Sequence, residues 1–265
     1  METKFWIVDT FSKKRFYGVP SAVFFVNKFD DEVLLQNIAA EINTPETIFI
    51  QESANGVFEA VCYTPTKKGL FFGNALYASA KIINETTKLT QFSIVCGIRS
   101  FLIDISKDGK IQVRFSTIEL EKVSVPVNLS TALNNELVVS LAECKDELVV
   151  EVRSPSRLFD LSPNMDMLAG MDYSSLAITA DTHYETDLNY DFCARIFAPK
   201  LGIFADIISP IACAKLSKYW TDRVGKTDLT ASGNKGQKVH VKVGNDYTYI
   251  AGNCVISSSG KMFLS

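Results

Sequence analysis

The chain has 265 residues, of which 47% are hydrophobic and 22% charged, and it carries a net charge of −3. This balance is typical of a globular protein and excludes a disordered one. The basic residues are too scattered for nucleic-acid binding, and no apolar run is long enough to span a membrane. An acid at position 9 stands where a secretory signal would carry its apolar core. We therefore expect a cytoplasmic protein with no nucleic-acid and no membrane partner.

The first half of the chain predicts several strands and two helices. A helix over 31–42 shows an apolar stripe, with Asp31 or the aspartate before it as the cap. A second helix, over about 74–84, is rich in small residues, so that other elements can approach its backbone closely. We expect this helix at the centre of a domain, and its open N-terminus at Gly73 and Asn74 can attract a carboxylate. Strands are predicted at 5–10, 22–26, 47–51, 58–63, 92–96, 100–105 and 111–115.

The second half repeats this plan. In each half a strand ends at a proline, Pro65 or Pro199, and a glycine-bearing loop then leads to a helix of small residues. Because the turns between strands are too short for helical crossovers, the sheets should be antiparallel or mixed. Helices are predicted at 134–142, 163–170 and 210–224, a loop at 200–206, and strands at 148–152, 176–179, 195–198, 239–243, 247–251 and 254–257.

This internal similarity predicts an α+β fold with two similar domains, residues 1–121 and 122–265. Each domain is expected to wrap a mixed or antiparallel sheet around a central helix, and the C-terminal tail can return to the first domain. The two central helices are expected to enter a shared cleft, which is where a ligand would bind.

The cysteines and histidines give no sign of a metal site. The six cysteines are spread along apolar runs without a Cys-x-x-Cys motif, which favours buried, reduced thiols over a disulfide framework or a metal site. The two histidines, His183 and His240, show no metal-ligand spacing. His240 shares a strand face with two lysines, so we expect it to face solvent. No metal and no cofactor are expected.

Six short motifs follow one another along the chain. They are Val-Asp-Thr-Phe at 8–11, Phe-Tyr-Gly-Val-Pro at 16–20, Pro-Glu-Thr-Ile-Phe-Ile at 45–50, Tyr-Thr-Pro with Phe-Gly-Asn-Ala-Leu at 63–76, Arg-Ile-Phe-Ala-Pro and the run that follows it at 195–212, and Tyr-Trp at 219–220. With these motifs the whole chain resembles the phenazine-biosynthesis PhzF-like family, which has the diaminopimelate-epimerase fold.

The resemblance implies an isomerase that needs no cofactor. In such an enzyme a glutamate, here Glu46, takes a proton from one carbon of a small carboxylate-bearing molecule and returns it to another. The family pattern makes Asp206 a second catalytic residue, in contact with the polar groups of the substrate. The substrate carboxylate is expected at the helix N-termini, with Gly73, Asn74 and Ser209 as the binding residues. Family members often dimerise, so a homodimer is the expected assembly.

Several positions depart from the family pattern and leave alternatives open. Asn74 replaces a histidine and cannot relay a proton at neutral pH. At the second helix, Pro210 and Ile211 replace Gly-Ser, so that one backbone N–H and one hydroxyl are lost. A catalytically inactive relative that binds a small molecule or a protein partner is therefore the alternative, and a structural subunit of a homo-oligomer is a third. Under either of these, Glu46 and Asp206 become ordinary structural acids and Asn74 a plain helix cap.

Overall fold

The computed structural model describes residues 2–29, 31–69, 73–144, 147–182, 185 and 188–263, without the side chains of residues 144, 201 and 203–207. The chain divides into two compact units. Unit 1 comprises Met1–Arg114 and Ala251–Ser265, and unit 2 comprises Phe115–Ile250. The strands β8 (Ile111–Ser116) and β17 (Tyr247–Gly252) carry the chain across the boundary. Each unit is described below by itself.

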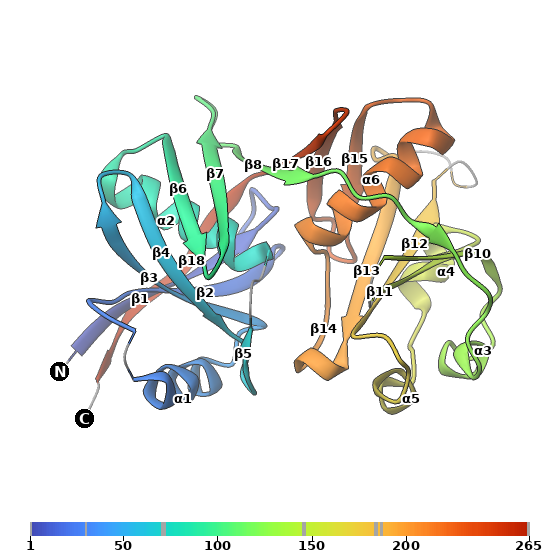
Figure 1. Cartoon of the computed structure of the whole chain (residues 1–265), viewed down its shortest axis with the longest axis horizontal. Helices are drawn as coiled ribbons and strands as arrows, with labels where there is room; N and C mark the ends of the chain where they lie inside the picture. The colour runs from blue at the N-terminus through green and yellow to red at the C-terminus, as the bar shows by residue number, and fades with distance from the viewer. Residues whose placement is uncertain are drawn as a thin grey trace. The chain divides into compact units, whose positions relative to one another are not determined.

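Unit 1 is a mixed sheet with two helices, α1 (Glu32–Ile42) and α2 (Gly73–Thr87). Its other strands are β1 (Glu2–Thr10), β2 (Val19–Phe25), β3 (Glu46–Ala54), β4 (Val57–Tyr63), β5 (Lys68–Gly69), β6 (Gln91–Cys96), β7 (Arg99–Ile105) and β18 (Cys254–Phe263). The last strand returns to the first, since β18 pairs antiparallel with β1 along its length (Figure 1, red against blue).

The helix α2 is the centre of unit 1. Every residue from Gly73 to Ala80 is buried, and the helix packs against β1, β2 and β3. Its alanine and serine positions allow this close approach, as the composition of the segment predicts. The ring of Tyr77 lies 4.7 Å from that of Phe11, which follows β1. The other face of the sheet packs on α1 through Phe24, Phe49 and their neighbours.

Helix α1 forms where the sequence predicts it. The side chain of Asp31 accepts a hydrogen bond from the backbone N–H of Leu34, and Asn43 ends the helix in the left-handed conformation. The apolar stripe of the helix, with Leu35 and Ile38, is buried against the sheet.

Unit 2 also consists of parallel and antiparallel strand pairs, with α6 (Pro210–Val224) as its long helix. Its strands are β9 (Glu121–Lys122), β10 (Val138–Cys144), β11 (Glu147–Val152), β12 (Ser175–Asp181), β13 (Phe192–Ala198), β14 (Ile203–Ile207), β15 (Asp228–Ser232) and β16 (Lys238–Val243). Its short helices are α3 (Leu129–Ala132), α4 (Pro155–Asp160), α5 (Met165–Ala169) and a 3-10 turn at Pro199–Leu201.

The two units share one pairing scheme. In unit 1 the pairs β1–β2, β2–β3, β3–β4, β4–β6 and β6–β7 are antiparallel, parallel, antiparallel, parallel and antiparallel. In unit 2 the pairs β10–β11, β11–β12, β12–β13, β13–β15 and β15–β16 have the same senses in the same order. In each unit the long helix, α2 or α6, lies along the chain between the fourth and the fifth strand of this scheme. The predicted α+β fold of two similar halves is therefore confirmed.

Two predictions for unit 2 are wrong. Residues 134–142, predicted as a helix, contain the start of the strand β10, which pairs with β11. Apolar residues in this short run fit either periodicity, and pairing with the buried strand β11 decides in favour of a strand. The predicted loop at 200–206 contains the end of the 3-10 turn and most of β14. No helix in the described part of the chain is long and apolar enough to cross a membrane.

Candidate active site

Glu46 is the first residue of β3, and its side chain is directed at the N-terminus of α2. It is only 2% exposed. Its Oε2 accepts a hydrogen bond of 2.6 Å from the backbone N–H of Ala75, and the backbone and side chain of Asn74 also donate to the carboxylate. The first N–H groups of a helix have no partner within the helix and carry its positive end. The carboxylate of Glu46 therefore caps α2.

Burial controls the protonation of Glu46. Loss of water around the carboxylate raises its pKa to about 7, although the hydrogen bonds from Ala75 and Asn74 lower the pKa in part. A carboxyl group with this pKa is present in both protonation states near neutral pH. It can therefore accept a proton in one step and donate it in the next, which is the requirement for a general acid/base.

Asn74 links Glu46 to the β1–β2 turn. Its side chain is fully buried and donates to the Glu46 carboxylate. The hydroxyl oxygen of Thr10 lies 3.1 Å from Asn74 Oδ1 and 3.1 Å from the carbonyl oxygen of Val19. The contact with Thr10 fixes which end of the Asn74 amide faces the carboxylate. Asparagine orients Glu46 in this way without exchanging a proton with it.

The turn that holds Thr10 in place needs a glycine. A Cβ atom at Gly18 would lie 2.6 Å from the carbonyl oxygen of Thr10, a distance that no side chain tolerates. The carboxylate of Asp9, which is 3% exposed, accepts a 2.5 Å hydrogen bond from the backbone N–H of Phe16 and closes the same turn. Sequence reasoning missed the roles of Asp9 and Thr10, although both lie in the first of the six motifs.

Two further residues surround the backbone of Glu46. The hydroxyl of Thr44 donates to the carbonyl oxygen of Glu46 at 3.0 Å and so fixes the start of β3. Ser21 lies opposite Glu46 in the parallel β2–β3 register, which places the two side chains on the same face of the sheet. Ser21 is fully buried, and its hydroxyl has no hydrogen-bond partner among the described residues.

The remaining predicted site residues lie at two helix entrances. Gly73 is the buried first residue of α2, and the three residues before it lie outside the described part of the chain. Ser209 is the N-cap of α6 in unit 2, but its side chain makes no capping hydrogen bond. Pro210 follows as the first helical residue. Asp206 belongs to β14, and its side chain lies outside the described part.

The internal repeat places a serine where Glu46 stands. In unit 1 the parallel strands pair Ser21 with Glu46, and in unit 2 the equivalent strands pair Glu147 with Ser175. Acid and serine have therefore exchanged strands between the two units. Pro65 lies two residues beyond the end of β4, and Pro199 lies directly after the end of β13, so the two prolines mark the ends of equivalent strands.

The acid of unit 2 has a cationic partner. Glu147 is 6% exposed, and it accepts a hydrogen bond of 2.5 Å from the hydroxyl of Ser175. The ammonium of Lys215 on α6 lies 3.0 Å from its other carboxylate oxygen. This buried ion pair occupies the place that corresponds to the Glu46 site. Sequence reasoning missed it, because aligning Pro65 with Pro199 matches Glu46 with Ala180 and not with Ser175.

None of the described thiols, those of Cys62, Cys96, Cys193, Cys213 and Cys254, forms a disulfide bond. Among the described residues, no group of three or more His, Cys, Asp or Glu side chains could hold a metal ion. His240 is half-buried on β16, and His183 lies outside the described residues.

The fold defines the class of protein. A PhzF-family structure from Enterococcus faecalis superposes with a TM-score of 0.89 at 23% identity, and each chain is covered completely. A hydroxyproline epimerase from Agrobacterium vitis superposes with a TM-score of 0.63 at 8% identity, over 98% of this chain and 92% of that one. The chain thus has the epimerase-like fold that PhzF proteins share with proline and hydroxyproline epimerases.

The sequence comparison identifies the family. The model for phenazine biosynthesis-like proteins (PhzC-PhzF) matches residues 8–260, and the chain belongs to this family. It is 26% identical over 274 residues to an uncharacterized isomerase of Halalkalibacterium halodurans, and 27% identical over 268 residues to one of Pseudomonas aeruginosa. Both alignments cover all of this chain and all of the relative. The predicted resemblance to the PhzF-like family is confirmed.

Proposed function

We propose that this protein is an isomerase that moves a proton between two carbons of a small carboxylate-bearing metabolite, with Glu46 as the general acid/base. The observation that carries the proposal is the buried Glu46 carboxyl at the N-terminus of α2, whose pKa is raised to about 7. The ionised form removes the proton from carbon, and the protonated form returns it to the other carbon. No cofactor is needed for this exchange.

The geometry also supports a role for Asn74. Its side chain holds the Glu46 carboxylate from one side and is itself held by Thr10, so the base is oriented by neighbours that take no proton. Under the proposal, Gly73 and Asn74 at the entrance of α2 bind the substrate carboxylate, Asp206 is a second catalytic residue, and Ser209 is a further substrate-binding residue. A homodimer remains the proposed assembly.

A second candidate is a relative that binds a small molecule or a protein partner without catalysis. The observation that favours it is the entrance of α6, where Pro210 has no backbone N–H and Ser209 makes no capping hydrogen bond. An anion would find fewer donors there than at an ordinary helix N-terminus.

Proton exchange with solvent separates the two candidates. The protein is incubated in D2O with a panel of small amino, hydroxy and unsaturated carboxylic acids, and deuterium uptake is measured by mass spectrometry. The proposal predicts uptake into at least one acid by the wild type and a loss of at least about a hundredfold in Glu46→Gln. Glu52→Gln is the matched control, since Glu52 is an exposed acid on the same strand and should leave uptake unchanged.

Two outcomes would contradict the proposal. Equal uptake in the wild type and in Glu46→Gln would remove Glu46 from the mechanism. Tight binding of an acid from the panel without any uptake would favour the non-catalytic candidate. Circular dichroism of each variant ensures that a loss of uptake is not a loss of fold.

A further inference from the structure

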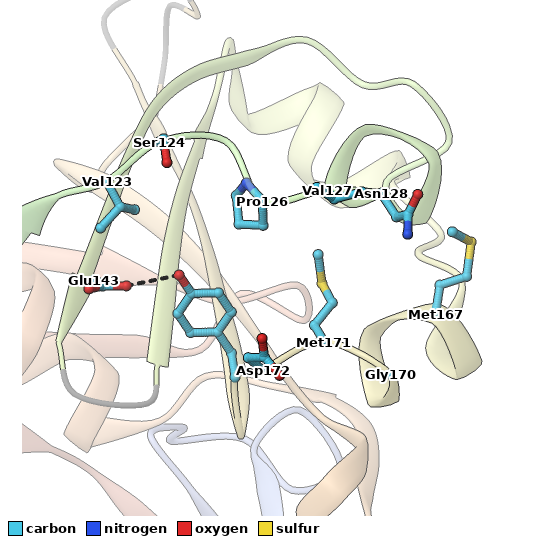
Figure 2. Close-up of a pocket in the computed structure, with 11 residues that line it drawn as sticks. Val123, Ser124, Pro126, Val127, Asn128, Glu143, Met167, Gly170, Met171 and Asp172 are labelled. Atoms are coloured by element: carbon cyan, nitrogen blue, oxygen red, sulfur yellow. Dashed lines mark hydrogen bonds between the residues drawn. The ribbon is translucent and has the colours of Figure 1, made fainter.

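Unit 2 contains a cavity that the proposed isomerase reaction does not use. Its volume is about 700 Å³, which is within the range of small-molecule sites. Three segments line it: the stretch before α3, the strand β10, and the turn after α5 (Figure 2). The lining residues are Val123, Ser124, Pro126, Val127, Asn128, Glu143, Met167, Gly170, Met171, Asp172 and Tyr173.

The charged groups in this lining are acidic. Glu143 and Asp172 contribute carboxylates, and none of the described lining residues is a lysine, arginine or histidine. On β9, Glu121 lies directly opposite Glu143 in the antiparallel register. Like charges at directly opposite positions destabilise a pair of strands. A bound cation would relieve this repulsion, so the arrangement favours a positively charged ligand.

Glu143 is held in place by a neighbour in the same cavity. The hydroxyl of Tyr173 donates to Glu143 Oε2 at 2.8 Å (Figure 2). The neighbouring carboxylate oxygen of Glu143, Oε1, stays available for a ligand, because a tyrosine hydroxyl donates only one hydrogen bond. Tyr173 also presents an aromatic ring to the cavity lining, and such rings attract cations.

The rest of the lining is apolar and adaptable. Val123, Pro126, Val127, Met167 and Met171 supply it. Methionine side chains are flexible and polarisable and adapt to the shape of an organic ligand. A metal ion would instead need several oxygen ligands at one point. The described residues contain no group of three or more acidic, histidine or cysteine side chains suited to one.

The side chain of a basic residue contacts the backbone of the cavity lining. The ammonium of Lys200 donates to the carbonyl oxygen of Met171. This ammonium lies at the residue next to Asp172 in the chain, whereas the bonded partner of Glu143 is the uncharged hydroxyl of Tyr173. Glu143 is therefore the group on which a cation would depend most.

We propose that this cavity binds a small organic cation, a protonated amine carried on an apolar body, with the ammonium at Glu143 and the body against Met167 and Met171. The site lies within unit 2 and is independent of the reaction proposed for Glu46. An aryl-ethylamine has the required size and chemistry, with one ammonium and one apolar ring.

Isothermal titration calorimetry with phenethylammonium tests the proposal on the full chain. The expected result is saturable binding that weakens at least about tenfold in Glu143→Gln, because a charge-assisted hydrogen bond is lost while the shape is kept. Tyr173→Phe should weaken binding less, since the carboxylate remains. Asp228→Asn, an exposed acid on β15 outside the lining, is the matched control and should bind as the wild type does.

Four results would overturn the proposal. The first is no binding of phenethylammonium by the folded wild type. The second is equal affinity for the neutral isostere 2-phenylethanol, which would make the cavity a purely apolar site. The third is an affinity for phenethylammonium that Glu143→Gln leaves unchanged, which would place the amine elsewhere. Calcium chloride is titrated in parallel, and binding of Ca²⁺ that Glu143→Gln abolishes would replace the organic cation by a metal ion.

Discussion

The Oε2 atom of Glu46 lies 2.6 Å from the backbone nitrogen of Ala75, so the proposed base and the helix N-terminus are already bonded to each other. An anionic ligand that approaches α2 meets this carboxylate first. Protonation of Glu46 removes the repulsion between its carboxylate and the anionic ligand. It also weakens the hydrogen bonds that Glu46 accepts at the N-terminus of α2. Binding of a carboxylate at this entrance is therefore coupled to the protonation of Glu46.

The raised pKa of Glu46 predicts a pH dependence of proton exchange, because only the ionised carboxylate removes a proton from carbon. Uptake of deuterium should rise with a midpoint near pH 7 as Glu46 ionises, when measured at substrate concentrations well below saturation. Asn74→Ala removes a hydrogen bond that lowers the pKa of Glu46, so the midpoint should move to higher pH. A titration of the Glu46 carboxyl carbon by NMR gives the same pKa without substrate. A midpoint near pH 4.5 in both measurements would contradict the burial argument.

Stability should also depend on pH through Glu46. Because its pKa rises from 4.5 to about 7 on folding, the folded state binds the proton more tightly, and this contribution to stability is complete below pH 4.5. It is lost as the pH rises through 7. Glu46→Gln has no such dependence, so its stability relative to the wild type should increase by about 3 kcal/mol between pH 4 and pH 8.

Urea unfolding of the two proteins across this pH range measures the effect. Glu52→Gln, which changes an exposed acid on the same strand, serves as the control and should follow the wild type. A constant difference between Glu46→Gln and the wild type at all pH values would show that the pKa of Glu46 is the same in the folded and unfolded states.

Thr10→Val tests the hydrogen-bond chain behind Glu46. The change keeps the shape of the side chain but leaves Asn74 Oδ1, in a fully buried residue, without the Thr10 hydroxyl. We expect a loss of about 1–3 kcal/mol in the free energy of unfolding. Thr90→Val alters an exposed threonine and should cost less than 0.5 kcal/mol, roughly the limit for surface changes. An equal effect of both changes would mean that Thr10 does not support Asn74.

Replacing only Lys215 of the Glu147–Lys215 ion pair should lower the free energy of unfolding more than replacing both residues. Lys215→Met leaves Glu147 buried without its cation and should cost about 3 kcal/mol, whereas Lys215→Met with Glu147→Gln should regain most of this loss. Lys218→Met breaks a more exposed pair with Asp222 on the same helix and should cost much less than Lys215→Met. Additive effects of the Lys215 and Glu147 changes in chemical unfolding would contradict a direct interaction.

Local patterns predicted most of unit 1. The capping of α1 by Asp31 and the burial of α2 follow from residues close together in the sequence, and the family and fold class were predicted from the motifs. The network behind Glu46 was not predicted, because it joins Thr10 to Asn74 across 64 positions of the chain. Such contacts depend on strand order, which no local pattern specifies.

In unit 2 the local patterns were less informative. The segment before β11 has apolar residues that fit a helix or a strand, and the neighbouring strand decided between them. The cluster of Glu147, Ser175 and Lys215 brings together three distant positions, and no motif marks any of them. The repeat did not indicate Ser175 either, because aligning Pro65 with Pro199 matches Glu46 with Ala180.

The return of β18 to β1 has a consequence for the order in which the protein folds during synthesis. Unit 2 is one continuous stretch, so it can fold as soon as that stretch has left the ribosome. Unit 1 begins first but lacks a strand until Cys254–Phe263 has been made, and until then β1 offers an unpaired edge on one side. The part of the protein that carries Glu46 is thus completed last, and the waiting β1 edge is where a nascent chain would most readily aggregate.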